Sequence, residues 1–438
     1  MDELIKKLMT LGVPGLLLWL AMMASGKTGD AGIWTGLANI GVIYGPRGGL
    51  LVLLMVGLVT NAVSKVAVDG LLVSFYQRRR ESQPSEKLVG EIDRLPISQD
   101  LKIKLKWAVL HHYMILPPYL IRWGFIVATV LLVLLSLTGY LGEFHYALDL
   151  SSHFKLQYLI AGFCLFFFFL MTKRKVWCIV SIFCILLNLI EVVPWYLPPR
   201  AILADAQASA NATNPNPQPL RILQSNVLFK NKQYSEVISL VQLENPDIAF
   251  FQEVGASWKK ELEALRDTFP YSLVPPIPAR FEPAIYSKLP LENTSITVLD
   301  ELIQILYAEV KVQEQVVSIV GIHLSTPMTQ RSFNHRNQQL AVFGDYLAKI
   351  KNPVLVVGDF NITMWSPFYK RFIQQTELKN ARYGFGILPT WSTKLPPLSI
   401  PIDHCLVSQN VKVLKIRTGR YVGSDHLPLV TDLVIGNR

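Results

Sequence analysis

The sequence is poor in cysteine and in charge. Three of its four cysteines, Cys164, Cys178 and Cys184, lie in apolar runs, and Cys405 stands alone in the second half of the chain. The absence of any CxxC pair excludes zinc sites built on such pairs, and the second half cannot form an internal disulfide. Charged residues make up 17% of the chain, and no Lys/Arg cluster of the kind that binds long polyanions stands out after residue 220.

A nucleotide-binding loop and a cleavable signal peptide are also missing. Ser25-Gly-Lys-Thr28 has the end of a phosphate-binding loop, but the motif requires a glycine where Ala21 stands. Residues 1–24 have the charged-then-apolar order of a signal peptide. Because the cleavage site is poor and further apolar segments follow, we interpret these residues as an anchor.

Apolar residues are abundant: they form 51% of the chain, and they gather in its first half, together with most of the net charge of +10. This uneven composition predicts five regions. They are a glycine-rich hydrophobic membrane module at 1–77, a polar, basic, partly helical cytoplasmic segment at 78–122, three transmembrane helices in 123–196, a flexible linker at 197–219, and an ordinary soluble-looking domain at 220–438.

The three predicted transmembrane helices are Trp123–Leu141, Leu156–Met171 and Val176–Val193. The first is long enough to cross a hydrocarbon core of about 30 Å. The third runs into Pro194-Trp-Tyr196, which is typical of an aromatic belt at a membrane interface. The preceding polar segment predicts two helices, Ser85–Leu95 and Gln99–Tyr113.

The distribution of basic residues predicts the topology. The stretch Arg78–Arg122 and the turn Lys173–Lys175 are basic and should face the cytoplasm, whereas Glu143–Lys155 carries two acids and one lysine and should face outward. Three crossings then leave the chain after Pro194 outside. We therefore expect a multi-pass protein of the inner (plasma) membrane, with the lipid bilayer as a partner and the domain at 220–438 extracytoplasmic.

The domain at 220–438 alternates strand and helix patterns. Helices are predicted at Ser235–Glu244, Trp258–Phe269 and Arg331–Ile350, and a β-rich portion around Ile296–Ile322. Such a pattern predicts an α/β sandwich of two packed sheets with helices outside.

One stretch organises this domain: Val354–Gly358 is continuously apolar up to its glycine, and Asp359, Phe360 and Asn361 follow. The apolar run predicts a buried strand. Because side chains alternate along a strand, Asp359 and Asn361 should leave its end on the same side. A carboxylate and an amide at the rim of a sheet are groups that can bind a phosphate ester and its metal ion.

Other polar residues also follow apolar runs, at the points where further strands are expected to end. They are Asn226, Glu253, His323, Asp403, His404, Asp425 and His426. Several strands rarely end in such side chains by chance, so we expect these residues to form one shared site.

With these blocks in this order, the sequence resembles the endonuclease/exonuclease/phosphatase superfamily over roughly Leu220–Asn437, and in particular its bacterial membrane-tethered members. The resemblance implies the deoxyribonuclease I-like fold: an α/β class, two-sheet sandwich, here preceded by an all-α transmembrane region. It also implies a metal-dependent phosphoesterase.

The resemblance implies a role for each polar residue. Glu253 would be the main metal ligand, supported by Asp425, and Asn226 would lie at the metal-bound phosphate. His323 would stabilise charge on the phosphate. Asp359 and Asn361 would position the nucleophile and a phosphate oxygen. His426 would be the general base, oriented by Asp403. His404 would support the site from behind.

The choice of metal follows from the proposed ligands. Glu253 and Asp425 offer hard oxygen atoms, and no soft cysteine site competes, so Mg²⁺ or Mn²⁺ is expected. For base catalysis, His426 has a suitable ordinary pKa, and Asp359 is the alternative base.

Several further residues have two interpretations. Arg331, His335 and Arg336 can bind phosphate, but we favour a solvated helix face. Trp365, Tyr369 and Trp391 can stack on a base or enter lipid headgroups, and packing is the default for each.

The substrate stays open at this point. Hydrolysis of nucleic-acid phosphodiesters is our first hypothesis, a phospholipid or sphingolipid phosphodiesterase the second. The third is a membrane interaction protein whose hydrolase activity is secondary or lost.

Overall fold

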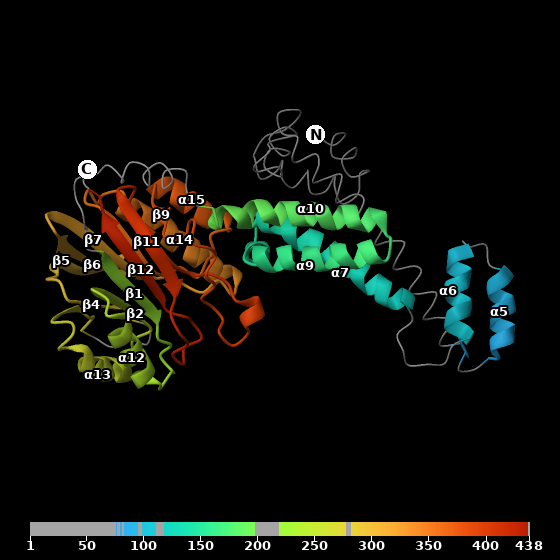
Figure 1. Ribbon diagram of the computed structural model, residues 1–438, viewed down its shortest axis with the longest axis horizontal. Helices are drawn as coiled ribbons and strands as arrows, with labels where there is room; N and C mark the ends of the chain where they lie inside the picture. Colours follow the sequence, from blue (N-terminus) through green and yellow to red (C-terminus); the bar gives the residue numbers. More distant parts are fainter. Residues whose placement is uncertain are drawn as a thin grey trace, which may run out of the picture. The chain divides into compact units, whose positions relative to one another are not determined.

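The computed structural model describes residues 76, 79–80, 83–94, 99–110, 118–197, 219–276 and 282–436 (Figure 1). The glycine-rich module predicted at 1–77 lies outside the described residues except for Tyr76. The predicted linker at 197–219 lies outside them except for its two end residues.

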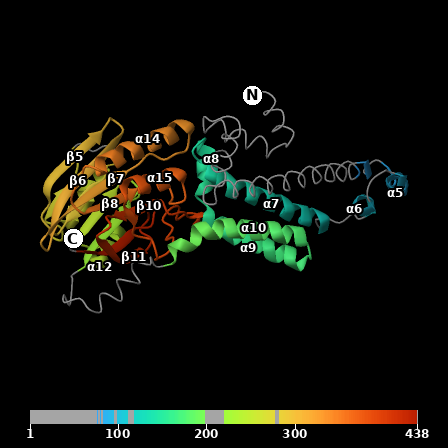
Figure 2. The ribbon, with the colours of Figure 1, turned by 90° about the horizontal axis from the view of Figure 1, so that it is seen from above.

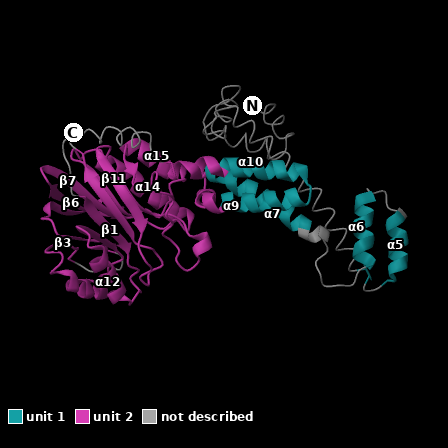
Figure 3. Cartoon of the chain, in the orientation of Figure 1, with its two compact units in different colours: residues 1–140, 158–187 teal, residues 141–157, 188–438 magenta. Residues whose placement is uncertain are grey.

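The chain forms two compact units (Figure 3). The first comprises residues 1–140 and 158–187, and the second comprises residues 141–157 and 188–438. The second unit therefore contains the segment that connects two of the apolar helices, as well as the end of the last one.

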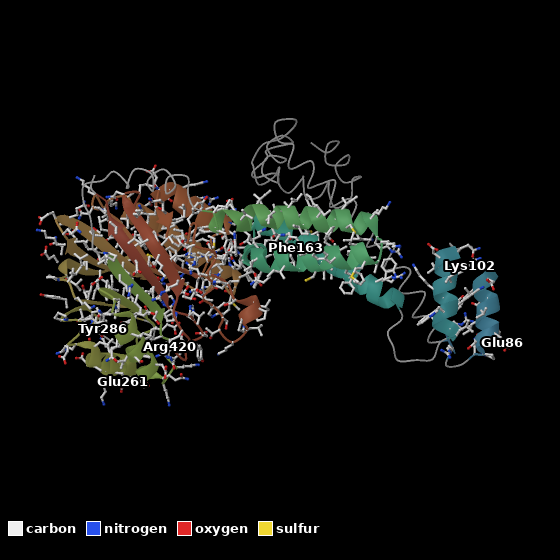
Figure 4. All side chains as sticks on the ribbon, viewed as in Figure 1. Glu86, Lys102, Phe163, Glu261, Tyr286 and Arg420 are labelled. Carbon is white, nitrogen blue, oxygen red and sulfur yellow. The ribbon has the colours of Figure 1, made fainter. Side chains whose placement is uncertain are left out.

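Within the first unit, α5 (Ser85–Arg94) and α6 (Gln99–Leu110) lie where two helices were predicted, and they pack against each other. Their contact is apolar: Leu88, Ile92 and Leu105 are buried in it. Charged residues such as Glu86 and Lys102 lie outside this contact (Figure 4). Amphipathic packing of this kind is what stabilises short helices.

Three apolar helices follow in the chain: α7 (Pro118–Thr138), α9 (Lys155–Met171) and α10 (Lys175–Val192). Arg122–Leu141 and Lys175–Trp195 are each long and apolar enough to cross a membrane. The short α8 (Tyr146–Ser152) and α9 meet the same test together, with a bend of 66° between them. The described residues thus provide two spans, or three when the bent pair counts as one.

These helices are apolar on their outer faces as well as on their inner ones. Cys184 and Phe169 are buried, whereas Ile179 is 63% and Phe163 on α9 is 42% exposed (Figure 4). Close packing at Gly162, where an added Cβ would lie 3.0 Å from the Ile185 side chain, brings α9 and α10 together. A helix that is apolar all round is typical of a membrane span.

The second unit is built on two six-stranded mixed sheets (Figure 1). In the first sheet the strand order is β11 (Val411–Thr418), β12 (Leu429–Ile435), β1 (Leu220–Asn226), β2 (Ile248–Gln252), β4 (Ala284–Ser287) and β3 (Tyr271–Leu273). In the second sheet it is β5 (Glu292–Leu299), β6 (Ile303–Val312), β7 (Gln315–His323), β8 (Val354–Asp359), β10 (Asp403–Val407) and β9 (Lys379–Asn380). This two-sheet arrangement confirms the predicted fold class.

The core lies between the sheets. Phe250 of β2 and Leu355 of β8 belong to one buried cluster with residues from both sheets. Gly321 on β7 permits this close contact, because an added Cβ there would overlap the Phe250 ring. The fully buried pattern of β8 agrees with its continuous apolar run.

Helices cover the outer faces of the sheets. On the first sheet, α12 (Tyr234–Glu244) and α13 (Ala256–Leu262) bury residues such as Trp258. On the second sheet, α14 (Gln330–Leu347) and α15 (Pro367–Thr376) lie side by side, with Phe343 stacked on Phe372 (Figure 2). The predicted helices are thus present, with ends shifted by a few residues.

The end of α10 packs on this sandwich within the same unit. The Trp365 indole N–H donates to the Glu191 carbonyl oxygen at 3.0 Å, and Lys370 Nζ pairs with the Glu191 carboxylate at 2.8 Å. The backbone N–H groups of Gly384 and Gly386 both donate to the Trp195 carbonyl oxygen. The sandwich therefore includes the last residues of this apolar helix among its own contacts.

Candidate active site

Strand register brings the predicted site residues together. In the second sheet, Asp359 at the end of β8 is paired with His323 on β7 and with Asp403 on β10. In the first sheet, Asn226 ends β1 next to the end of β2, directly before Glu253. The carboxyl ends of the parallel neighbours β7 and β8, and of β1 and β2, bring their last residues together, and Asp403 joins them from the first residue of the antiparallel β10.

The centre of the site is a histidine between two carboxylates. His426 Nδ1 lies 2.8 Å from Asp403 Oδ2, and His426 Nε2 lies 3.7 Å from Asp359 Oδ2. His323 Nε2 also lies 3.7 Å from the same oxygen atom, Asp359 Oδ2. All three central side chains, those of Asp359, Asp403 and His426, are almost fully buried.

Burial and neighbouring charges shift the pKa of each of these three groups. Burial opposes protonation of His426, but the charge and hydrogen bond of Asp403, helped by Asp359 and Asp425, raise the pKa of His426 to about 10. Burial and the nearby Asp403 charge raise the pKa of Asp359 well above its usual range. Burial also acts against ionisation of Asp403, but the His426 ring outweighs it and lowers the pKa of Asp403. The pair His426–Asp403 is therefore held as a charged pair.

The turn after β8 is closed by hydrogen bonds of Asp359 and Asn361. The Asn361 backbone N–H donates to Asp359 Oδ1 at 2.8 Å, and its side-chain amide donates to the Leu324 carbonyl oxygen at 2.8 Å. Asn361 has a φ of 48°, in the left-handed region that asparagine tolerates better than most residues. The two side chains predicted to act together are thus locked in one turn.

Glu253 is held at the start of a loop in the first sheet. Its carboxylate accepts hydrogen bonds from Asn226 Nδ2 at 3.1 Å and from the Phe229 backbone N–H at 3.2 Å. Its φ of 61° is unusual for a glutamate. Such a backbone conformation persists only when its surroundings stabilise it, as is common at functional sites.

The two oxygen atoms of the Asp425 carboxylate have different surroundings. Trp391 Nε1 donates to Asp425 Oδ2 at 3.3 Å, whereas Asp425 Oδ1 is buried and has no hydrogen-bond partner among the described residues. The neighbouring Ser424 hydroxyl donates to the Asn226 carbonyl oxygen at 2.7 Å and accepts from the His426 backbone N–H. Ser424 thereby links Asn226 to His426. Its role was not predicted from the sequence, although Ser424 directly precedes Asp425 and His426.

His404 is next to Asp403 on β10 and is fully buried. Its Nε2 donates to the Ile362 carbonyl oxygen at 2.8 Å, and its Nδ1 lies 2.9 Å from the Asn380 amide. Burial, together with the Arg382 charge, lowers the pKa of His404 to about 3. The ring is therefore neutral at physiological pH and supports the loop that follows Asn361.

The interpretation of Arg336 as part of a solvated helix face is wrong. Its side chain is fully buried in α14, and its Nη1 donates to the Asn361 carbonyl oxygen at 3.1 Å. A signal was present in the sequence: Phe333, Arg336 and Leu340 follow the i, i+3, i+7 spacing of the buried helix face.

Two sets of residues are candidates for holding a divalent cation. Asp359, Asp403 and His426 each place one ligand atom within 4.8 Å of the others. In this set, however, Asp403 and His426 are already bonded to each other. Glu253 and Asp425 are not part of that group, but the orphaned, buried Asp425 Oδ1 is the kind of atom that a cation satisfies.

The fold and this site together define a class. A two-sheet α/β sandwich with carboxylates, asparagines and histidines at one end of its strands has the deoxyribonuclease I-like architecture. Residues 223–426 match the model described as the Endonuclease/Exonuclease/phosphatase family. The predicted resemblance is thus confirmed, and the activities in the family's name all hydrolyse phosphate esters.

Solved structures with a similar fold include enzymes and enzyme domains from several organisms. TDP2 of Caenorhabditis elegans, in truncated form, is 17% identical, with 50% of this chain and 100% of that chain covered and a TM-score of 0.43. An endonuclease/exonuclease/phosphatase of Bacteroides vulgatus is 19% identical, with 50% and 99% covered and a TM-score of 0.43. The human Nocturnin catalytic domain is 19% identical, with 51% and 100% covered and a TM-score of 0.41. No curated protein matches the chain.

Proposed function

We propose that this protein is a membrane-anchored, metal-dependent phosphodiesterase that hydrolyses nucleic acid. The observation that carries the proposal is the buried array of Asp403, His426 and Asp359, in which the distances are 2.8 and 3.7 Å. A histidine held by one carboxylate and facing a second reacting group is an arrangement suited to proton transfer from water.

The residues of this array have distinct roles in the proposed reaction. His426 accepts the proton of the attacking water, and Asp403 fixes the ring and stabilises the imidazolium that forms. The cationic form of the His426 ring is strongly stabilised, and only the neutral form can accept a proton. Asp359 is therefore the alternative proton acceptor. His323 donates to the phosphate oxygens, where negative charge accumulates in the transition state.

Glu253 and Asp425, with Asn226 beside them, would hold Mg²⁺ or Mn²⁺. Both carboxylates supply hard oxygen ligands, and Asp425 Oδ1 has no other partner among the described residues. When bound, such an ion neutralises the charge of the phosphate ester and helps to orient it. Asn226 keeps Glu253 in place through its side-chain hydrogen bond.

One aromatic side chain next to the proposed metal ligands favours a nucleic-acid substrate. Trp391 is half-buried and bonded to Asp425, so a ring lies next to the proposed metal ligand. Base stacking on such a ring is a common, sequence-tolerant contribution to binding. A phospholipid or sphingolipid phosphodiesterase is the second candidate, supported by the apolar helices that would place the site near a bilayer.

The anchor proposed here is the set of helices that are apolar on their outer faces. With the basic turn Lys173–Lys175 in the cytoplasm, the end of α10 emerges outside, and the domain from β1 to β12 is extracytoplasmic. A reporter fused after Arg438 would be active only outside the cytoplasm; activity inside would contradict this topology.

The activity is tested with the full chain in detergent or nanodiscs. Plasmid DNA, RNA and phospholipid vesicles are incubated with Mg²⁺ or with a chelator, beside the variants Glu253→Ala and His426→Ala. Nicking of nucleic acid that requires metal and both residues supports the proposal. Headgroup release without nicking supports the lipid substrate, and a folded protein with no turnover supports a membrane interaction protein.

Asp359→Asn and His426→Gln separate the two candidate bases. The residue that accepts the proton should lower kcat about 100-fold or more when replaced, while the other should have the smaller effect.

A further inference from the structure

A buried ion pair joins the segment between α7 and α9 to the catalytic sandwich. Arg336 Nη2 lies 2.8 Å from Asp149 Oδ2, and both side chains have an exposed fraction of 0%. Asp149 is on α8, whereas Arg336 is on α14, 187 residues further along the chain. Charged side chains are almost never fully buried unless they are paired, so each of these two depends on the other.

The same guanidinium reaches the active site. While Nη2 binds Asp149, Nη1 donates to the Asn361 carbonyl oxygen at 3.1 Å. Asn361 is the residue whose backbone N–H is bonded to Asp359 at 2.8 Å. The planar fork of arginine can serve two acceptors at fixed angles, and a lysine cannot.

Two further contacts extend the connection along the loop after β8. The Ser366 hydroxyl donates to Asp149 Oδ1 at 2.5 Å, and His153 Nδ1 lies 3.0 Å from the Thr363 hydroxyl. Asp149, His153, Thr363 and Ser366 are all buried. One face of the loop is therefore built by residues that precede the loop by 210 and 217 positions in the sequence.

We propose that Asp149 and Arg336 are positioning residues for the Asp359–Asn361 turn, so that the segment between α7 and α9 forms part of the catalytic unit. This inference rests on the proposed phosphodiesterase function. Neither residue touches the reacting groups: Asp149 holds the guanidinium, and the guanidinium holds the Asn361 carbonyl. The segment between α7 and α9 thus carries a piece of the active-site support and is more than a connection between two apolar helices.

A matched control is available at the end of α10. Lys370 and Glu191 also join an apolar helix to the sandwich through a partly buried ion pair at 2.8 Å. Lys370 lies on α15 and Glu191 on α10, whereas the Asn361 carbonyl oxygen is held by Arg336 of α14. Lys370→Gln should therefore disturb the packing between helix and sandwich without moving the site.

The test uses the full chain, with Asp149→Asn, Arg336→Lys and Lys370→Gln compared under the same conditions. Arg336→Lys keeps a positive charge for Asp149 but loses the second arm to Asn361, so it reports on positioning even if Asp149→Asn folds poorly. We expect kcat to fall about 10- to 100-fold in both site-linked variants, with KM little changed, and to stay near the parent value in Lys370→Gln.

Hydrogen exchange of the peptide covering residues 355–363 provides a readout that does not need turnover. Exchange should rise in Asp149→Asn and Arg336→Lys and stay unchanged in Lys370→Gln. Equal losses in all three variants, or unchanged exchange in the first two, would overturn the positioning role. A parent protein without phosphodiesterase activity but with this exchange pattern would reject the proposed function alone.

Discussion

His426 and Asp403 are hydrogen-bonded through Nδ1 and Oδ2 at 2.8 Å, although Asp403 begins a strand of the second sheet and His426 lies in the loop before a strand of the first sheet, 23 residues further along the chain. Asp403 lies at the site because β10 pairs with β8 in a register that places Asp403 opposite Asp359. His426 lies just before β12 of the first sheet. The pair therefore exists only when both sheets are packed, which couples the proposed chemistry to the folding of the whole sandwich.

Asp403→Asn should remove most of the activity while leaving the fold intact. The amide has nearly the same shape, but it cannot stabilise the imidazolium or impose the same tautomer on His426, so kcat should fall about 100-fold or more. Steady-state nuclease assays with Mg²⁺ measure this. As a control, Asp432→Asn removes a carboxylate that pairs with Arg221 on the first sheet and should leave kcat near that of the parent. Similar losses in both variants would contradict a specific role for Asp403.

Gly321→Ala should destabilise the protein through the core between the sheets. An added Cβ would overlap the Phe250 ring, which is fully buried, and relieving that overlap should cost about 1–3 kcal/mol in the free energy of unfolding. The fall in Tm of the detergent-solubilised protein checks the prediction. Gly255→Ala is the matched control, because nothing lies within 4 Å of a Cβ added there. Equal Tm values for the two variants would show that the Phe250 ring can move aside without lowering the stability of the protein.

Much of this fold and part of this site follow from local patterns. The apolar run of β8 predicts a buried strand, and the alternation of side chains predicts that Asp359 and Asn361 share a side. His404 also obeys that alternation: it is adjacent to Asp403 on β10, yet it points away from the reacting groups toward Asn380. Its supporting place was therefore within reach of sequence reasoning.

The Asp149–Arg336 pair was not within reach. Helical spacing with Phe333 indicates that Arg336 is buried, but no periodic pattern names a partner on a different helix so far away in the chain. Asp149 also lies in a segment interpreted as an outward-facing connection, where an acidic residue is ordinarily solvated. Long-range pairs of buried charges depend on tertiary packing, and a single sequence carries no signal for that packing.

Removal of the divalent cation should abolish turnover, and the two proposed carboxylate ligands should set its affinity. Glu253→Gln and Asp425→Asn each remove a negative charge and a hard oxygen ligand, so the Mg²⁺ concentration that gives half-maximal activity should rise at least about tenfold. Titration of chelated protein with Mg²⁺ provides the measurement. The part of the intrinsic fluorescence change that is lost in Trp391→Phe, whose parent residue is hydrogen-bonded to Asp425, gives a signal without turnover. An unchanged half-maximal concentration in both variants would point to Asp359, Asp403 and His426 as the ligands instead.

His404 should make the protein less stable as the pH falls from about 6.5 to 5. Its pKa is lowered to about 3 in the folded state, whereas an unfolded histidine titrates near 6.5. The unfolded state therefore binds the extra proton in this window, and the free energy of unfolding falls by up to about 1.4 kcal/mol for each pH unit. His404→Gln, which can still donate to the Ile362 carbonyl oxygen, should flatten this part of the profile. The difference between parent and variant isolates His404, because Asp359, whose raised pKa acts with the opposite sign, is present in both. Parallel profiles in urea unfolding of the detergent-solubilised proteins would mean that the buried ring is already protonated in the folded state.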